Sequence, residues 1–292
     1  MIFPAAPGGY GVTERTVCYW NLVHGASKIL TAKQLNLSED TVQSYFRLGR
    51  LICGQDALHR QQKIVFGRRG DETTDIEIDE HSWHGWQAGN MHYFYVWIGI
   101  QQRGDLSKLW LMPLRGSDPD MPLGVVHSRD EARVPPLTDQ CLQECLEAAL
   151  SEEANVNAMT DSALAYQALK VGPHGIVAKF LVNHSADPPE FTRPIEVIAN
   201  VATQETRPGY AGTQNIDGTW KHLEKHIPEQ LSKARTEETR VMCAERIRFG
   251  QWMYMLGPSD KWVAFCQAAA RYETISLEDK PGETVRAGKR KA

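Results

Sequence analysis

Three aspartates stand at positions where a carboxylate could take part in chemistry. Asp79 belongs to the alternating segment IEIDE, Asp161 directly follows the apolar run VNAMT, and Asp217 opens the helical segment NIDGTWKHLEKHI. Carboxylates that converge from three elements can hold two Mg²⁺ ions about 3.5–4 Å apart, a geometry that activates a water or a 3′-hydroxyl for phosphodiester displacement. Their types and places therefore make these three residues candidate catalytic and metal-binding acids.

The surroundings of Asp79 admit two interpretations. Ile76 and Ile78 precede it in a strand pattern, and a carboxylate buried without a partner is costly because it must find a cation, a proton or a metal. Strand alternation places Asp79 on the same side as Glu77 and opposite Ile78. A solvent-facing strand edge is thus the alternative to a functional site.

The hydrophobic pattern predicts the elements that must carry these acids. Alternation together with aromatic and β-branched residues predicts three strands, with a hairpin turn at Gly104 and Asp105, over 74–80, 92–101 and 108–116. Two more strands are expected over 154–159 and 176–183. Helices are expected over 138–150 and 162–170 and in three stretches from residue 215 to about 272. This order indicates a mixed α/β sheet flanked by helices.

Residues 12 to about 52 predict a helical segment ahead of the sheet. KILTAKQLNLSEDTVQSYFRLGRLI carries a helix, a turn at residues 36–38 and a second helix with Ser38 as its N-cap, which is a helix-turn-helix pattern. Small helical interaction modules share this pattern. In a DNA-binding unit the second helix enters the major groove. It would present to bases or phosphates Thr41, Gln43, Ser44, Arg47 and Arg50.

Composition limits the classes of protein. The 292 residues are 42% hydrophobic with a net charge of −4, which permits a sizeable core and argues against a general polyanion binder. Residues 45–70 nevertheless carry six basic residues against Asp56 alone, which predicts a local positive field or a merely solvated surface. The apolar stretch at 91–100 is far shorter than the ~20 residues of a membrane span, and no signal peptide is recognised. An intracellular protein without membrane association is expected.

Four ordered motifs add a resemblance to a known family. IEIDE, MTDSALAYQALK, LVNHS and GTQNIDGTWKHLEKHI together resemble the catalytic-domain signatures of the ISXO-type insertion-sequence DDE transposases and the related eukaryotic Merlin elements, over roughly residues 74–256. The resemblance implies an RNase H-like fold, with Asp79, Asp161 and Asp217 as catalytic acids that bind two Mg²⁺ or Mn²⁺ ions. His184 in LVNHS would be a motif residue.

The same resemblance implies partners and domains. The partners would be double-stranded DNA, as element terminal repeats and target DNA, and further copies of the chain in a homodimer or higher oligomer. The expected domains are a helix-turn-helix segment over 1–60, a catalytic domain over 70–273 and a disordered basic tail over 274–292. The expected location is the nucleus in a eukaryote, and otherwise the cytoplasm or nucleoid.

The chain departs from the family pattern around the third acid. Family members usually have His-Thr-Asn ahead of a Glu, with a Lys further along the helix, where this chain has Gly212, Thr213, Gln214, Asp217 and Glu224. The third metal ligand is therefore Asp217, Gln214 or Glu224. A domesticated or degenerate DNA-binding protein without catalysis is the alternative to an active transposase, and an unrelated α/β protein is the third reading.

Overall fold

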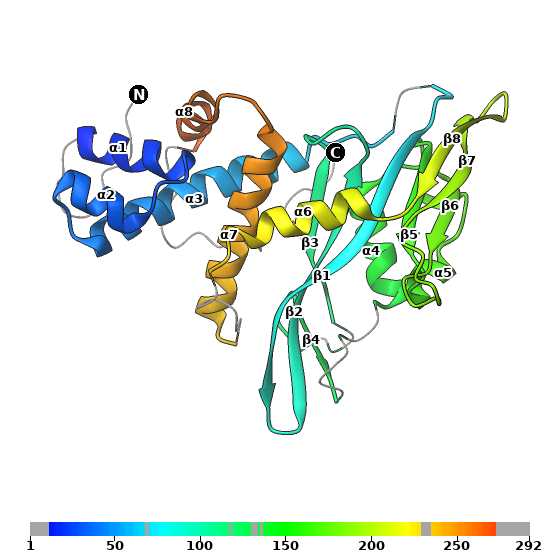
Figure 1. Cartoon of the computed structure of the whole chain (residues 1–292), viewed down its shortest axis with the longest axis horizontal. Helices are drawn as coiled ribbons and strands as arrows, with labels where there is room; N and C mark the ends of the chain where they lie inside the picture. Colours follow the sequence, from blue (N-terminus) through cyan, green and yellow to red (C-terminus); the bar gives the residue numbers. More distant parts are fainter. Residues whose placement is uncertain are drawn as a thin grey trace. The chain divides into compact units, whose positions relative to one another are not determined.

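The computed structural model describes residues 12–67, 70–116, 118, 120–129, 134, 137–228 and 235–272. The chain divides into two units (Figure 1). The helical unit comprises Met1–Gln62 and Val241–Ala292, and the sheet unit comprises Lys63–Arg240. None of the described helices is long and apolar enough to cross a membrane. The expected tail over 274–292 lies outside the described residues.

The sheet unit contains the mixed sheet that the pattern predicted. Its order is β3-β2-β1-β5-β6, and β4 pairs with β2. The strand β2 runs antiparallel to its neighbours β1 and β3, whereas β5 runs parallel to β1, and β6 parallel to β5. Their bounds are β1 Thr74–Ala88, β2 Met91–Gln102, β3 Leu109–Pro113, β4 Val125–Ser128, β5 Val156–Asp161 and β6 Ile176–Val182.

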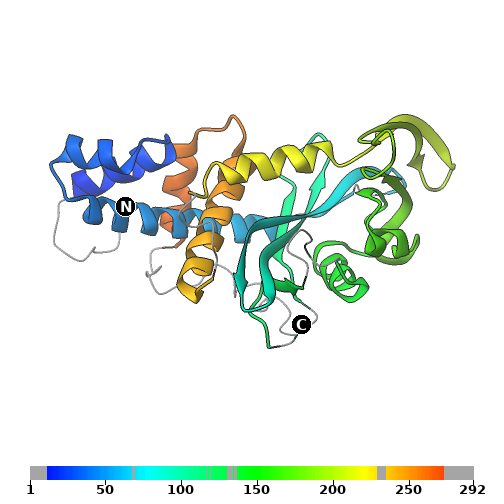
Figure 2. The same cartoon turned by 60° about the horizontal axis from the view of Figure 1, so that its bottom comes forward.

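Helices cover both faces of this sheet. On one face Ile76 and Ile78 belong to an apolar core that includes α4 (Asp139–Ala149) and α5 (Leu164–Ala168). The opposite face of β1 and β2 is covered by α6 (Gln214–Glu224), as Figure 2 shows. Because strand side chains alternate between faces, every second residue of β1 from Glu77 to Trp83 points toward α6.

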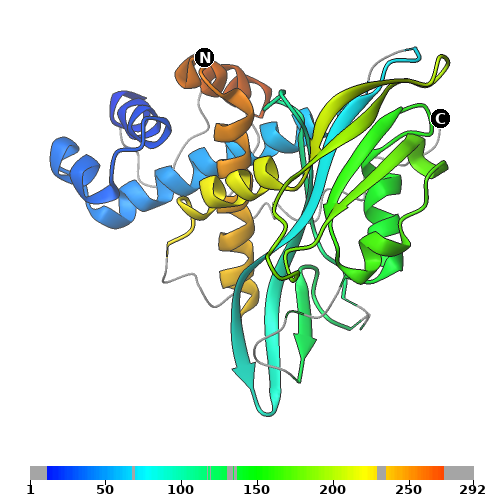
Figure 3. The ribbon, with the colours of Figure 1, turned by 45° about the vertical axis from the view of Figure 1, so that its right-hand side comes forward.

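The structure contains two strand regions that the sequence pattern did not predict. The strands β1 and β2 continue together as a ribbon as far as Ala88 and Met91, with β4 paired along β2 (Figure 3). A hairpin of β7 (Arg193–Asn200) and β8 (Glu205–Ala211) lies between β6 and α6 in the chain. Asn157 of β5 and Thr73 both donate to the carbonyl oxygen of Ile198, which anchors this hairpin to the sheet.

The helical unit packs segments from both ends of the chain around one core. It contains α1 (Val12–Val23), α2 (Lys28–Leu35), α3 (Glu39–Gln61), most of α7 (Glu237–Leu256) and α8 (Lys261–Arg271). The expected turn is present: Asn36 adopts a left-handed conformation, and the Ser38 hydroxyl accepts from the backbone N–H of Thr41 as N-cap. The core joins α1 and α3 to Phe249, Trp252 and Phe265 of the last two helices.

Buried polar contacts reinforce this union of distant segments. Asp56 of α3 is fully buried and accepts from Arg60, from the indole of Trp252 at 3.0 Å and from Arg271. The expected boundaries had placed α7 and α8 with the catalytic sheet. Their buried faces belong instead to the core of the N-terminal helices, so residues 1–60 do not contain a whole folding unit.

We therefore predict that residues 1–62 expressed alone show no cooperative thermal transition, because the exposed apolar faces of short helices leave them marginal without tertiary packing. Co-expression with residues 235–292 should restore the transition. Far-UV circular dichroism during heating measures this, with the full chain as the reference. A sharp transition of the 1–62 fragment by itself would contradict the shared core.

Candidate functional site

The face of β1 that points toward α6 carries an unusual run of side chains. Glu77, Asp79, His81 and Trp83 alternate along it, while Ile76 and Ile78 face the apolar core. Glu77 is fully buried and Asp79 is partly buried. The expected alternation is thus confirmed, and the face that carries Asp79 is covered by a helix.

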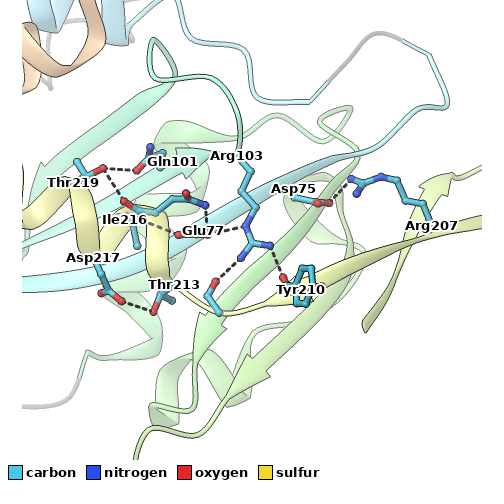
Figure 4. Close-up of polar contacts among 12 residues, drawn as sticks. Asp75, Glu77, Gln101, Arg103, Arg207, Tyr210, Thr213, Ile216, Asp217 and Thr219 are labelled. Atoms are coloured by element: carbon cyan, nitrogen blue, oxygen red, sulfur yellow. Dashed lines mark hydrogen bonds and ion pairs between the residues drawn. The ribbon is translucent and has the colours of Figure 1, made fainter. Parts of the chain in front are cut away.

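Glu77 connects β1 to the start of α6 (Figure 4). Its carboxylate accepts from Arg103 Nε at 2.7 Å, from Asn215 Nδ2 at 2.8 Å and from the backbone N–H of Ile216 at 2.9 Å. An anion near the first N–H groups of a helix is favoured because these groups lack partners within the helix. The contacts hold the first turn of α6, which contains Asp217, against β1.

Arg103 extends this connection into the segment that leads to α6. Its guanidinium donates to the carbonyl oxygens of Tyr210 and Gly212, the latter at 2.8 Å. One turn further along α6, the Thr219 hydroxyl donates to the side chain of Gln101 on β2 at 2.6 Å. The helix is therefore fixed to two strands by buried polar contacts (Figure 4).

Asp79 is surrounded by like charges. Burial raises the pKa of its carboxyl well above the usual range, and the neighbouring carboxylate of Glu80 raises this pKa further. The indole N–H of Trp220, which donates to Asp79 Oδ2 at 2.8 Å, lowers the pKa, whereas Asp217 and Asp161 raise it. A divalent cation would offset all of these unfavourable contributions at once.

The structure brings the three predicted acids within electrostatic reach of one another. Asp161 ends β5, and its Oδ1 accepts from the backbone N–H of Ala163 at 2.9 Å. Burial raises the pKa of Asp217, the Thr213 hydroxyl and the charges of His184 and Lys221 lower this pKa, and Asp161 raises it. The site thus draws one acid each from β1, β5 and α6.

The side chains of the three acids are not close enough together to form a complete metal site. Among the described residues, no group of three or more His, Cys, Asp or Glu side chains is placed so that it could hold one metal ion. The other candidates for a third ligand lie at the two ends of α6. Gln214 is exposed at the first residue, and Glu224 at the last residue pairs with His81 Nε2 at 3.2 Å.

Several residues of this site were not among the predicted functional residues. Glu77 was seen only as a neighbour on the same side as Asp79, and Trp220 only as part of a motif. Glu80 accepts from the hydroxyl of buried Tyr166, and burial raises the pKa of the Glu80 carboxyl. The sequence signal for Glu77 and Glu80 is their place beside Asp79 in IEIDE, where three of five residues are acidic.

The predicted DNA-binding residues all lie on α3 but differ in their accessibility. Ser44 is exposed and Thr41, Gln43 and Arg47 are half-buried, whereas Arg50 is buried. Arg47 Nε lies 3.3 Å from a carboxylate oxygen of Glu245, and Arg50 pairs with the same carboxylate. Arg50 is therefore a structural residue in this conformation, and its expected phosphate contact is not retained.

The predicted positive field over residues 45–70 is reduced in the same way. Arg47 and Arg50 share the carboxylate of Glu245, which offsets one of their two charges, and Arg60 is paired with Asp56 at 2.7 Å. Lys63 is exposed, while Arg68 and Arg69 lie outside the described residues.

Comparison of the chain with protein-family models, with curated proteins and with solved structures found no match.

We predict that Arg103→Met lowers the free energy of unfolding by about 3–5 kcal/mol, because it leaves the buried Glu77 carboxylate without its cation. The matched control is Arg207→Met. Arg207 pairs at 2.8 Å with Asp75 on the same strand, but its side chain is 42% exposed, so a loss of at most about 1 kcal/mol is expected.

Urea unfolding followed by circular dichroism measures both changes. The double variant Arg103→Met with Glu77→Met should lose less stability than the sum of the two single variants, because it leaves no charge unpaired. Additive losses would show that the two side chains do not depend on each other.

Proposed function

We propose that this chain is a DDE-type transposase, an enzyme that cleaves the DNA at the ends of a transposable element and joins it to target DNA with the help of Mg²⁺ or Mn²⁺. The observation that carries the proposal is the placement of the three acids on neighbouring elements of the sheet unit: Asp79 on β1, Asp161 at the end of β5, which pairs with β1, and Asp217 in the first turn of α6, which is bonded to β1. Asp217 and Asp161 raise the pKa of Asp79, and Asp161 raises the pKa of Asp217, as is expected where a metal supplies the missing charge.

The strand arrangement supports an RNase H-like fold. In that fold an antiparallel meander of three strands is extended by two strands parallel to the first, and this is the order and direction of β3-β2-β1-β5-β6. The family's acids lie on the first strand, after the parallel strand beside it, and on a later helix. Asp79, Asp161 and Asp217 have these places.

The chemistry assigns a task to each group. A pair of divalent cations, when bound, polarises the scissile phosphate and lowers the pKa of the attacking water or 3′-hydroxyl. Asp79, Asp161 and Asp217 would hold these cations through carboxylate oxygens, the ligands that Mg²⁺ prefers. The Thr213 hydroxyl orients Asp217 by donating to its Oδ2 at 3.3 Å. Glu77 and Arg103 hold the helix that carries Asp217.

The helical unit supplies a surface for recognition of double-stranded DNA. We propose that α2, the turn at Asn36 and α3 form a helix-turn-helix, with Thr41, Gln43 and Ser44 facing the bases and Arg47 facing a phosphate. A homodimer or higher oligomer would bring the two element ends together. The proposed activity requires access to chromosomal DNA, in a nucleus or a nucleoid.

A second function is favoured by the residues of α6. Asp217 is one methylene shorter than the family's Glu, and Glu224 has the opposite charge to the family's Lys. Mg²⁺ demands near-octahedral geometry at about 2.0–2.1 Å, so a shorter side chain weakens the third ligand unless the helix moves closer. A domesticated protein that binds DNA without cutting it is the alternative.

We predict that Asp79→Ala and Asp161→Ala each reduce DNA cleavage below detection and leave DNA binding nearly unchanged, because they remove metal ligands and no phosphate contact. The assay uses the purified full chain, Mg²⁺ or Mn²⁺ and a plasmid that carries the terminal repeats of its own element. Binding is followed by gel shift on the same repeats.

Asp105→Ala is the matched control, since Asp105 is a half-buried carboxylate in the turn between β2 and β3 and accepts from the backbone N–H of Ser107. It should cut as wild type does. Retained cleavage by Asp79→Ala and Asp161→Ala would refute the assignment. Binding without cleavage by the wild-type chain in either metal would select the domesticated alternative.

We also predict that Arg47→Ala weakens DNA binding and reduces the slope of log affinity against log salt by about one, the value for one lost phosphate contact. Glu245 stays neutralised by Arg50, so the fold should persist. Lys170→Ala removes one charge from an exposed residue beyond α5 and should leave the slope unchanged. Fluorescence anisotropy at several salt concentrations measures this, and equal slopes for all three proteins would place the DNA contact elsewhere.

A further inference from the structure

A large aromatic side chain faces solvent at the edge of the candidate site. Phe191, in the segment between β6 and β7, is 58% exposed. The ring of His184, from the start of the same segment, lies beside it with ring centroids 5.1 Å apart. A single exposed apolar residue is ordinary on a protein surface. The role of Phe191 therefore depends on how the ring is held and on what surrounds it.

The segment that carries Phe191 is fixed by its own contacts. The backbone N–H of Glu190 donates to the carbonyl oxygen of Asn183 at 3.0 Å, and the Glu190 carboxylate accepts from the backbone N–H of Asn183 at 3.4 Å. A Cβ atom at Gly212 would lie only 2.7 Å from the carbonyl oxygen of Phe191, so the strand that leads to α6 approaches this backbone as closely as a glycine permits. The fold thus holds Phe191 in place and leaves its ring uncovered.

The same segment borders two of the candidate acids. On one side the hydroxyl of Ser162, the residue after Asp161, donates to Asn183 Oδ1 at 3.2 Å. On the other side, burial raises the pKa of Asp217 and the nearby charge of His184 lowers it. The exposed ring therefore lies at the rim of the acids, where the proposed reaction places the scissile phosphate.

Cationic side chains accompany the ring. Arg193 follows Phe191 by two residues, and its side chain is 46% exposed. Lys221 on α6 is exposed and lies close enough to Asp217 to lower the pKa of that carboxyl, against the effect of burial. Aromatic rings beside cations are typical of surfaces that bind single-stranded nucleic acid, because bases stack on the rings and phosphates bind the cations.

A base inside a duplex is stacked on its neighbours, so it reaches a protein ring only after it has left the stack. We propose that Phe191 stacks on an unpaired base of the DNA beside the candidate acids, so that the chain prefers DNA with a single-stranded end to closed duplex. The inference rests on the proposed function and deepens it, because it names the form of DNA that the site accepts. It requires no bound metal.

The test compares two DNA molecules in the presence of EDTA, so that neither metal binding nor cleavage contributes. One is a short blunt duplex, and the other is the same duplex with an unpaired tail. Fluorescence anisotropy with the full chain gives both Kd values, and wild type should bind the tailed DNA more tightly. Phe191→Ala should raise the Kd for tailed DNA about 5–150-fold, the range for one lost base stack, and leave that for blunt duplex within about twofold.

Two further substitutions at the same position separate stacking from general apolar contact. Phe191→Trp keeps a flat ring and should retain the preference for tailed DNA, whereas Phe191→Leu keeps an apolar side chain without a ring and should lose it. Val171→Ala is the matched control. Val171 is 54% exposed and precedes β6, whereas Phe191 follows this strand, so the control lies toward the opposite end of β6 and should bind both DNA molecules as wild type does.

The outcomes separate this inference from the function on which it rests. An unchanged preference in Phe191→Ala, an equal loss in Val171→Ala, or equal binding of both DNA molecules by wild type would overturn the stacking role and leave DNA binding standing. No binding of either DNA by wild type would overturn the proposed function.

A crosslinking measurement on wild type keeps the inference testable should the variants fail to fold. Iodouracil in the unpaired tail forms a crosslink to a stacked aromatic ring under near-ultraviolet light, and peptide mass spectrometry identifies the residue. The crosslink is expected at Phe191. A crosslink found only at other residues, or none at all with DNA bound, would contradict the proposal.

Discussion

The carboxylate of Glu77 is fully buried, and it is stable there only because Arg103, Asn215 and the first turn of α6 surround it. Transfer of a lone carboxylate from water into such a place would cost several kcal/mol even after the protein relaxes. The need to satisfy Glu77 therefore dictates where α6 begins, how the helix lies on β1 and β2, and which of its residues reach the sheet. These contacts fix the first turn of α6, which contains Asp217, and the hydrogen bonds of Thr219 and Trp220 fix the following turn.

The two faces of β1 are held by different kinds of contact. Ile76 and Ile78 join α4 and α5 in a core whose interactions are non-directional and tolerate small shifts. The face toward α6 is held by hydrogen bonds from Arg103, Thr219 and Trp220, which fix direction as well as distance. A site that must place carboxylates accurately gains from the second kind of contact, and the period of a strand allows both kinds on adjacent residues.

Local pattern was enough to predict the sheet but not the contacts that complete the site. Alternation around Ile76 and Ile78 predicted β1 and the side on which Asp79 lies. The partners of Glu77 lie 26 and 138 residues away in the chain, and no local period reports such a distance. The β7–β8 hairpin was missed because Pro194 and Pro208 interrupt its strand pattern. From the sequence alone, Arg50 fits an exposed basic helix face. In the fold it is buried in an ion pair with Glu245, which is far from it in the sequence.

Glu77 and Asp79 stand two residues apart on the same face, and the contrast between them gives the strongest reason to assign chemistry to Asp79. Glu77 has a guanidinium and two further donors, so its charge is compensated within the fold. Asp79 has one neutral donor. The charges that act on it come from Glu80, Asp217 and Asp161, and each of these makes the negative charge of Asp79 less favourable. A cation of the chain beside Asp79, like Arg103 beside Glu77, would stabilise the fold. In the proposed transposase a cation from outside the chain would compensate the carboxylate of Asp79, and Glu77 would have the role of support.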